Sequence, residues 1–353
     1  MNRFKKAIYF FLKRLFLSRN GIDILSQSLG NRIILYPQHN KKLYDFVNPY
    51  FTLSQSSYTS KIYVGCPIFI TGRFRSGSTL LWNVFRQLQG VTSYYEPLNE
   101  RKWFDPNSRG EKLDSTHVNV ESDYWREYDG LNDWLKHLYQ ESWIERDLYM
   151  DEGASDWDLH RYIAELINAA PGRSALQFNR ADFRLPWLKL IFPHANFIHI
   201  FRHPRDQWIS TLMDPESFGP HSGDLAAFEK VDEFYLCMWV RDLQHWFPFL
   251  QDWSRHPYYH FYFLWKLSFV FGKRYCQHSL KFENLVTHPR EVLEPLFTDL
   301  EIHEPDWRTI LPIIATPKLG KWMDYAEERW FYDIEAECEE ELQLFFGWGG
   351  NYA

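Results

Sequence analysis

The sequence predicts an α/β fold in which helices cover both faces of a mostly parallel central sheet. Short apolar runs of strand-forming residues recur along the chain, and segments with helical apolar spacing separate them. Two of these runs lead directly into loops rich in Gly and Ser or in Arg. Strands that alternate with helices pair in parallel, and the helices that connect them cross over the sheet. Helices therefore cover both of its faces.

The first strand is expected at residues 68–71, where four residues of high β-propensity precede a Gly-containing loop. After the loop, Leu81, Val84, Phe85 and Leu88 have the i, i+3, i+4, i+7 spacing of a helix that packs on a sheet. A second strand, 91–95, follows.

The later elements are inferred from the same patterns and from Pro and Gly stop signals, such as the pair at 171–172 and Pro204 at the first turn of a helix. The further strands are expected at 175–178, 196–201 and 279–282. The further helices are expected at 131–144, 159–169, 183–191, from 204 on, 228–250, 258–275, 284–300 and 323–346. A stretch rich in Gly, Pro and Ser, 214–224, is expected to be a mobile surface loop and a candidate lid.

The composition is that of a globular protein. Of the 353 residues, 45% are hydrophobic and 24% are charged, so a large core can form. Aromatic residues reach 19%, which indicates an aromatic core and a cleft lined with rings. The formal net charge of −7 argues against a nucleic-acid partner. The four cysteines are far apart without a C-x-x-C pair, which indicates neither a zinc site nor a disulfide framework.

Two parts are expected: a helical extension over residues 1–60 and one α/β domain over 61–353. Residues 1–17 mix basic and apolar side chains. Their longest uncharged run, 7–12, is far too short for a membrane span and marginal for the apolar part of a secretory signal. We therefore expect a cytoplasmic protein. The basic amphipathic segment either packs on the domain or contacts the anionic inner surface of a membrane.

The loop after the first strand is a candidate phosphate cradle. Gly72 and Gly77 allow the backbone to turn tightly. Free backbone N–H groups at the start of the following helix can then point at one anion. These N–H groups belong to Ser76, Gly77, Ser78 and Thr79.

This loop differs from a nucleoside-triphosphate loop at one decisive position. Ser78 stands where the lysine of a Walker A motif belongs, and Arg75 brings the cation into the loop instead. No convincing Walker B strand follows. A Mg²⁺-dependent triphosphatase is therefore disfavoured, although a P-loop kinase-like phosphotransferase remains an alternative.

A second anion site is expected at the end of strand 196–201. Arg202 follows this strand at the edge of the sheet where open α/β folds bind ligands, and Ser210 lies two helical turns further on. An arginine fork and a hydroxyl can together hold a phosphate. The alternative is an ordinary capping arginine and a helix serine.

Both segments resemble one family. Residues 73–81 resemble the 5′-phosphosulfate loop of sulfotransferases that use 3′-phosphoadenosine 5′-phosphosulfate (PAPS), and 197–206 with Ser210 are similar to that family's 3′-phosphate strand and helix. Weaker likenesses extend over roughly residues 65–347, including 318–322, which resembles the family's C-terminal loop. The resemblance implies a P-loop-type α/β fold, PAPS as sulfuryl donor and no metal.

The resemblance also implies roles for particular residues. Arg75 takes the place of the cation beside the transferring sulfuryl group, and residues 76–79 serve the 5′ side. Arg202 and Ser210 take the 3′-phosphate, joined there by Lys321 or by Lys318.

Glu96, directly after the second strand, is the candidate base, because an acceptor hydroxyl becomes nucleophilic as its proton is accepted. Its context at 95–98 resembles the carbohydrate sulfotransferase branch. One alternative is a structural ion pair with an arginine such as Arg101. The other is a histidine base, for which His117 is the loosely comparable candidate.

The predicted activity is thus sulfuryl transfer from PAPS to a hydroxyl acceptor, with a sugar or glycoconjugate as first choice and a lipid-linked or small alcohol next. A catalytically inactive, nucleotide-binding interaction protein is a further alternative, which the presence of Arg75, Glu96, Arg202 and Ser210 disfavours.

Overall fold

The computed structural model describes residues 66–110, 120 and 123–346. Five strands form one sheet in the order β2-β3-β1-β4-β5, and every neighbouring pair is parallel. The strands are β1 (Ile68–Thr71), β2 (Val91–Tyr95), β3 (Arg173–Phe178), β4 (Asn196–Phe201) and β5 (His278–Lys281). The predicted parallel α/β fold is confirmed. The expected extension at 1–60, with its basic segment 1–17, lies outside the described residues.

The register of β1 assigns its side chains to two separate cores. Phe69 lies opposite Leu176 and Phe197 on the neighbouring strands, and all three belong to the larger aromatic core. Ile68 and Ile70 belong to the second, mainly aliphatic core. Since successive side chains of a strand point to opposite faces, the two cores lie on opposite sides of the sheet.

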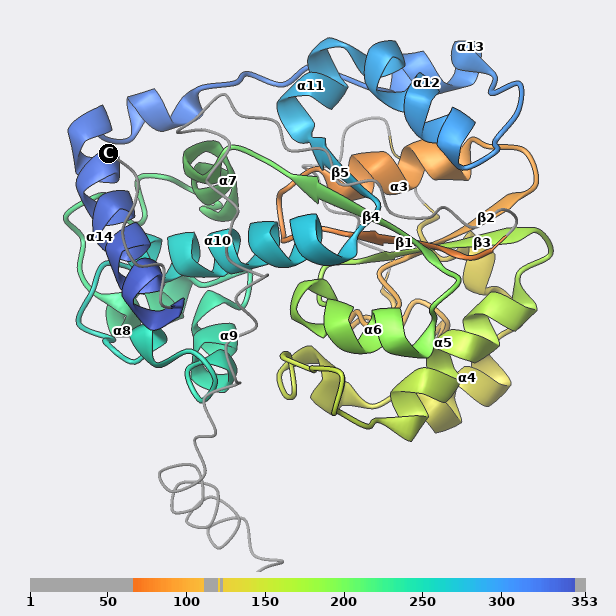
Figure 1. Cartoon of the computed structure of the whole chain (residues 1–353), viewed down its shortest axis with the longest axis horizontal. Coiled ribbons are helices and arrows are strands. Elements are labelled where there is room, and N and C mark those ends of the chain that lie inside the picture. Colours follow the sequence, from red (N-terminus) through yellow and green to blue (C-terminus); the bar gives the residue numbers. More distant parts are fainter. Residues whose placement is uncertain (1–65, 111–119, 121–122, 347–353) are drawn as a thin grey trace, which may run out of the picture.

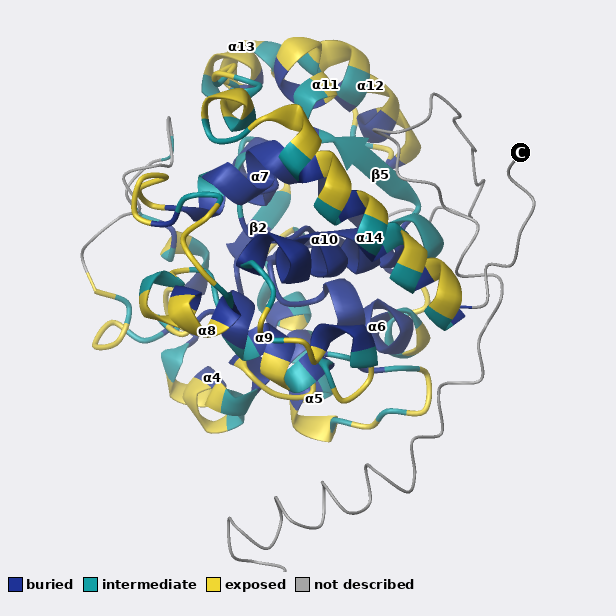
Figure 2. Ribbon diagram, turned by 90° about the vertical axis from the view of Figure 1, so that its left-hand side faces the viewer, coloured by how far each residue is buried: buried dark blue, intermediate teal, exposed yellow. Residues whose placement is uncertain are grey.

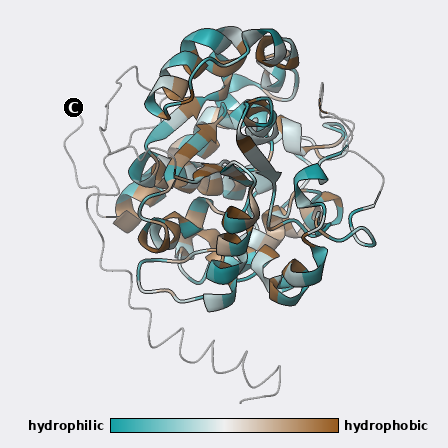
Figure 3. Cartoon of the chain, turned by 90° about the vertical axis from the view of Figure 1, so that its right-hand side faces the viewer, coloured by the Kyte–Doolittle hydropathy of each residue, from teal (hydrophilic) through white to brown (hydrophobic). Residues whose placement is uncertain are grey.

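The aliphatic core is covered by four helices, seen above the sheet in Figure 1. They are α3 (Ser78–Arg86), α11 (Phe282–Thr287), α12 (Pro289–Asp299) and α13 (Trp307–Ile310). Their outer turns are largely hydrophilic at the top of Figure 3. The core on this face is therefore closed by amphipathic helices.

The opposite face is covered by more numerous helices that are richer in aromatic residues. They are α4 (Asn132–Leu138), α5 (Trp157–Ala169), α6 (Leu185–Ile191), α9 (Leu236–Leu243) and α10 (Pro257–Tyr275), with the short α8 (Leu225–Phe228) and with α7 (Pro204–Thr211) after β4. Helix α10 is buried almost throughout, and α14 (Glu328–Phe346) packs on it with an exposed outer stripe (Figure 2). The aromatic core predicted from composition is confirmed on this face.

Buried charges fasten α14 to the domain. Arg205 of α7 forms a two-pronged ion pair with Glu335, at 2.9 and 2.8 Å, and its guanidinium lies 4.7 Å from the ring centre of Trp322 and 5.3 Å from that of Phe331. Lys266 of α10 pairs with Glu339 at 2.7 Å. Glu335 is buried and Glu339 is half-buried, so two glutamates of this acidic helix face the domain and not solvent.

Three expected helices are broken in the structure. The expected helix at 228–250 becomes α8, a 3₁₀ turn and α9, because Asp232 accepts backbone hydrogen bonds from Leu236 and Cys237 and starts a new helix. The expected helix at 284–300 divides at His288, since Pro289 disfavours helical dihedrals in the residue before it.

The third break lies within 131–144, where Tyr139 is extended between α4 and a 3₁₀ turn, Glu141–Ile144. The expected helix 323–346 begins only at Glu328, after a 3₁₀ turn at Lys321–Asp324. The other expected elements are present, with bounds that differ by up to two residues.

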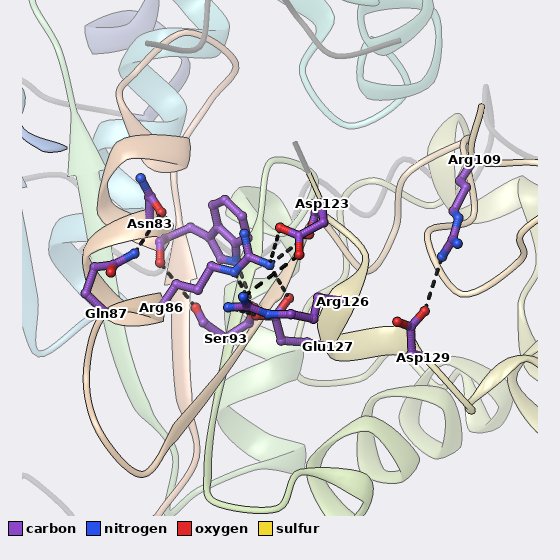
Figure 4. Close-up of polar contacts among 10 residues, drawn as sticks. Asn83, Arg86, Gln87, Ser93, Arg109, Asp123, Arg126, Glu127 and Asp129 are labelled. Atoms are coloured by element: carbon purple, nitrogen blue, oxygen red, sulfur yellow. Dashed lines mark hydrogen bonds and ion pairs between the residues drawn. The ribbon is translucent and has the colours of Figure 1, made fainter. Parts of the chain in front are cut away.

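An ion-pair cluster on α3 positions residues 123–127 (Figure 4). Arg86 is buried and pairs with Asp123 at 3.0 Å and with Glu127 at 2.7 Å. This cluster holds Tyr124 against the ring of Tyr95, with ring centroids 4.8 Å apart. A buried arginine on α3 thus places a ring next to the end of β2.

The segment at 214–224 contains no helix or strand, as expected. Phe218 is nevertheless only 4% exposed and packs against Phe228 and His256. The loop is therefore anchored at its centre, and its role as a lid remains a prediction. Among the described helices, none has the length and apolar character needed to cross a membrane.

Candidate functional site

A cleft of about 930 Å³ opens where β1, β2 and β4 end. This is the carboxyl edge of the parallel sheet, where ligands of open α/β folds bind. The cleft is lined by nearly all of the site residues predicted from the sequence. These are Arg75, Gly77, Ser78, Thr79, Glu96, Arg202, Ser210 and Lys321.

The loop between β1 and α3 takes its shape from two left-handed residues. Arg75 has φ 67° and Gly77, the N-cap of α3, has φ 97°. A Cβ added to Gly77 would lie 2.3 Å from the Phe282 ring, so this position requires glycine for space as well as for conformation. The tight turn predicted at Gly77 is present.

Ser76 does not line the cleft, and its predicted role at the donor stays a prediction. Its backbone N–H donates to the carbonyl oxygen of Arg73 at 3.1 Å, so this amide is used inside the loop. The Ser76 side chain is 1% exposed, and its hydroxyl has no hydrogen-bond partner among the described residues. The turn that brings Arg75 into the cleft buries Ser76, which leaves residues 77–79 of the predicted cradle at the cleft wall.

The two predicted anion sites meet at Ser210. Arg202 Nη1 donates to the Ser210 hydroxyl at 2.9 Å, and Arg75 Nε donates to the Ser210 carbonyl oxygen at 3.0 Å. The Arg202 guanidinium also lies 4.9 Å from the centre of the Phe282 ring. One residue of α7 therefore positions two guanidinium groups that the sequence separates by 127 positions.

The C-terminal loop is attached to the same helix. Asp206 accepts backbone hydrogen bonds from Gly320 at 2.7 Å and from Trp322 at 3.3 Å. Lys321 lies between these two amides and lines the cleft. Lys318, the other lysine considered, pairs with Asp324 at 2.7 Å on the exposed surface. The structure thus favours Lys321 of the two.

Glu96 lies in the cleft at the end of β2, with φ 39° and only 5% of its surface exposed. The side-chain amides of Asn99 and Asn179 donate to its two carboxylate oxygens. Burial raises the pKa of Glu96, partly offset by Arg180, whose Nη1 lies 3.9 Å from the carboxylate. The ion pair is therefore with Arg180, whereas the Arg101 guanidinium lies over the ring of Trp103.

Asn179 is the residue at this site that the sequence reasoning missed. It follows β3 directly, and its side-chain oxygen accepts hydrogen bonds from the Ser78 hydroxyl and the Gln177 amide, each at 2.8 Å. The signal was available, because the residue after a central parallel strand lies at the same sheet edge as Glu96 and Arg202.

Aromatic rings form one wall of the cleft beside Glu96. Tyr95, Trp103 and Tyr124 all line it, and their ring centroids lie between 4.8 and 5.7 Å apart. Thr79 and the Tyr95 hydroxyl are 3.1 Å apart, which joins this wall to the donor loop. The ring-lined cleft expected from composition is present.

His199 and His203 lie on either side of Arg202 in the sequence, the first buried and the second half-buried. Burial lowers the pKa of His199 to about 3 and that of His203 to about 4, so both rings are neutral near pH 7. His199 packs against Gly272, and His203 stacks on Trp322. His117, the candidate for a histidine base, lies outside the described residues.

A model of the sulfotransferase family matches residues 67–306, about two thirds of the sequence. This chain belongs to the sulfotransferase family. The family and the parallel fold identify it as a transferase that moves a sulfuryl group. Both segments that carry the resemblance, around Arg75 and around Arg202, fall inside the matched region.

Several solved sulfotransferases are similar to this one at low identity. The sulfotransferase domain from the curacin biosynthetic pathway is 16% identical, with 80% of this chain and 99% of that chain covered and a TM-score of 0.39. The domain from the Synechococcus PCC 7002 olefin synthase is 15% identical, with 85% and 100% covered and a TM-score of 0.39. STF1 from Mycobacterium tuberculosis H37Rv is 15% identical, with 94% and 86% covered and a TM-score of 0.38. No curated protein matches the sequence significantly.

Among residues 66–110, 120 and 123–346 of this sulfotransferase, no group of three or more His, Cys, Asp or Glu side chains is arranged to hold a metal ion. The expectation of metal-independent transfer stays a prediction.

Proposed function

We propose that this sulfotransferase transfers a sulfuryl group from PAPS to a hydroxyl acceptor, with a sugar or glycoconjugate as the first candidate. One observation carries the proposal. The loop at Arg75, the Arg202–Ser210 pair and the buried Glu96 line a single cleft, although they follow three different strands. A donor with two anionic ends and an acceptor hydroxyl require such a combination of groups.

The residues present fit the donor. Gly77 is the N-cap of α3, and the first turn of this helix lies at the cleft with Arg75 beside it. Backbone N–H groups at a helix N-terminus and a guanidinium together suit a phosphosulfate. Arg202, Ser210 and Lys321 supply a guanidinium, a hydroxyl and an ammonium for a 3′-phosphate. PAPS would supply the sulfuryl group together with a phosphate leaving group.

Residues of the chain stabilise the developing charge and accept the proton of the acceptor. Arg75 and the N-terminus of α3 stabilise negative charge that develops at the donor loop during transfer. Glu96 accepts the proton of the acceptor hydroxyl. The burial that raises the pKa of this carboxylate brings it closer to neutral pH, which makes it a better base for an alcohol.

The aromatic wall supports a sugar acceptor. Tyr95, Trp103 and Tyr124 present rings next to Glu96, and the apolar faces of sugars pack on such rings while polar groups fix their orientation. Glu100 and Arg101, which also line the cleft, supply those polar groups. A lipid-linked or small alcohol would use the same wall without the polar contacts.

The deciding experiment is calorimetric titration of the metal-free protein with 3′-phosphoadenosine 5′-phosphate, the desulfated donor, and in parallel with ATP plus Mg²⁺. We expect micromolar binding of the bisphosphate that disappears in Arg202→Ala. Arg290→Ala, which removes an exposed arginine stacked on Trp307, is the matched control and should bind like the wild type. Binding of Mg-ATP alone would instead support a kinase-like phosphotransferase.

An acceptor screen then tests the reaction itself. Wild-type protein and Glu96→Gln are incubated with PAPS and with sugar, glycolipid and simple alcohol acceptors, and the released bisphosphate is measured. Transfer to sugars that is lost in Glu96→Gln supports the proposal. Bisphosphate binding without transfer to any acceptor would favour the inactive interaction protein. The cytoplasmic location and the membrane contact through residues 1–17 stay predictions.

A further inference from the structure

Asn179 connects the donor loop to the proposed base. Its side-chain oxygen accepts the Ser78 hydroxyl at 2.8 Å, and its side-chain amide donates to a carboxylate oxygen of Glu96. All three side chains line the cleft, and each residue is at most 5% exposed. We call these two hydrogen bonds the Asn179 bridge. The bridge connects Ser78, the first residue of α3, to Glu96, which follows β2, and all of it lies in the cleft.

The orientation of this amide is set by its surroundings. Gln177, fully buried on β3, donates its own amide to the Asn179 oxygen at 2.8 Å. With that oxygen held by two donors, the Asn179 nitrogen is directed to Glu96. A buried polar group that loses its partner costs free energy, so the arrangement resists rotation.

The bridge also fixes the carboxylate. Asn179 donates to one oxygen of Glu96 and Asn99 donates to the other, so the carboxylate is held at both ends. A carboxylate held in this way presents its remaining lone pairs in fixed directions toward the cleft. Precise placement of a base matters for rate, because a displacement of about 1 Å costs up to about 10²-fold.

We propose that Asn179 is a positioning residue that aligns the Glu96 base with the Ser78 end of the donor loop. This inference rests on the proposed function, because it assigns Asn179 a part in the same site. Asn179 acts through its two neighbours: it orients the carboxylate that takes the proton and the hydroxyl that borders the donor.

The other charged or titratable groups facing Glu96 are Arg180, Glu100, Tyr95, Tyr128 and Tyr235. Arg180 favours the ionised carboxylate, and Glu100 opposes it. An amide that donates to the carboxylate acts in the same direction as Arg180. Removal of the Asn179 donor should therefore move the protonation midpoint of Glu96 to higher pH.

Two substitutions separate the two bonds of Asn179. Asn179→Ala removes both, whereas Asn179→Asp keeps an acceptor for Ser78, removes the donor to Glu96 and adds a like charge. We expect the acidic limb of kcat/KM to move to higher pH in Asn179→Ala and further in Asn179→Asp. We expect kcat near neutral pH to fall by up to about 10²-fold, while affinity for the bisphosphate changes little.

Asn83→Ala is the matched control. Asn83, on α3, is buried like Asn179, but it contacts Gln87 (Figure 4) and does not line the cleft. It should keep the wild-type pH profile, and thermal melting of both variants checks that they fold. If Asn179→Ala folds and shows the wild-type acidic limb, the inference is overturned.

A second readout does not need turnover. Infrared difference titration of wild type against Glu96→Gln reports the carboxyl midpoint of Glu96 in the protein without donor. A midpoint that rises in Asn179→Ala supports the bridge, and an unchanged midpoint overturns it. A wild type that binds no bisphosphate overturns the proposed function instead, so the two failures are distinguishable.

Discussion

Arg75 and Arg202 donate hydrogen bonds to the same residue: Arg75 Nε to the carbonyl oxygen of Ser210, and Arg202 Nη1 to its hydroxyl. Two guanidinium groups that would repel each other are thereby held at fixed places in one cleft. An anionic ligand between or beside them would relieve that repulsion, so the arrangement favours the binding of an anion.

Ser210→Ala tests this junction. The substitution removes the hydroxyl that accepts from Arg202 but leaves the carbonyl that accepts from Arg75. Because hydrogen bonds to charged groups contribute about 1.5–3 kcal/mol, we expect bisphosphate affinity to fall roughly tenfold or more. Calorimetry measures this loss, which should be smaller than in Arg202→Ala. Thr211→Ala, which removes the neighbouring hydroxyl bonded to Trp208, should leave affinity unchanged.

Asp206→Ala should weaken donor binding indirectly, through the loop that carries Lys321. Asp206 holds the amides of Gly320 and Trp322, so its loss frees the loop that carries Lys321. We expect weaker bisphosphate binding and faster hydrogen exchange over residues 318–322. Since both changes act through Lys321, the double variant with Lys321→Ala should lose less affinity than the sum of the single losses.

Asp324→Ala is the control for this prediction. It breaks the exposed ion pair with Lys318, which contributes little to stability. Affinity for the bisphosphate should remain that of the wild type. Fully additive losses in Asp206→Ala/Lys321→Ala would contradict the proposed attachment.

Gly77→Ala should cost more stability than Gly90→Ala. Both glycines have positive φ, for which alanine costs about 1–2 kcal/mol. At Gly90 nothing lies within 4 Å of an added Cβ, whereas at Gly77 the Phe282 ring lies 2.3 Å away. Urea denaturation measures the difference, and bisphosphate binding should be lost in Gly77→Ala alone. Equal costs would show that the loop shifts to accommodate the methyl group.

Glu96 should make the protein less stable as the pH rises. Burial raises its pKa in the folded protein above the ordinary value, so the folded state binds the proton more tightly than the unfolded state. Stability is then lost as the pH rises from the ordinary glutamate pKa through the folded pKa. Glu96→Gln has no such titration, so the melting temperature of the variant minus that of the wild type should increase with pH. A difference independent of pH would contradict the assignment.

The sequence by itself determined the parallel fold and which predicted residues end its strands. Strand-forming runs that alternate with helical spacing specify a parallel sheet, and the residues that end its strands must then meet at one edge. Arg75, Glu96, Arg202 and Ser210 could therefore be placed together without coordinates, and all four line the cleft. The local signals at Gly77 and Pro204 also sufficed, because turn and helix-start geometry depend on neighbours in sequence.

Only the tertiary structure decided the contacts between distant segments. The burial of Ser76 depends on how the turn packs, and the pairing of Glu96 with Arg180 depends on the register of β2 against β3. The contacts of Asn179 with Ser78 and Glu96 require three elements to come together. The breaks in the long helices also arise from side chains such as Asp232, whose oxygens compete for backbone amides. Periodicity reports which face is apolar, but it carries no information on which polar groups meet across the sheet edge.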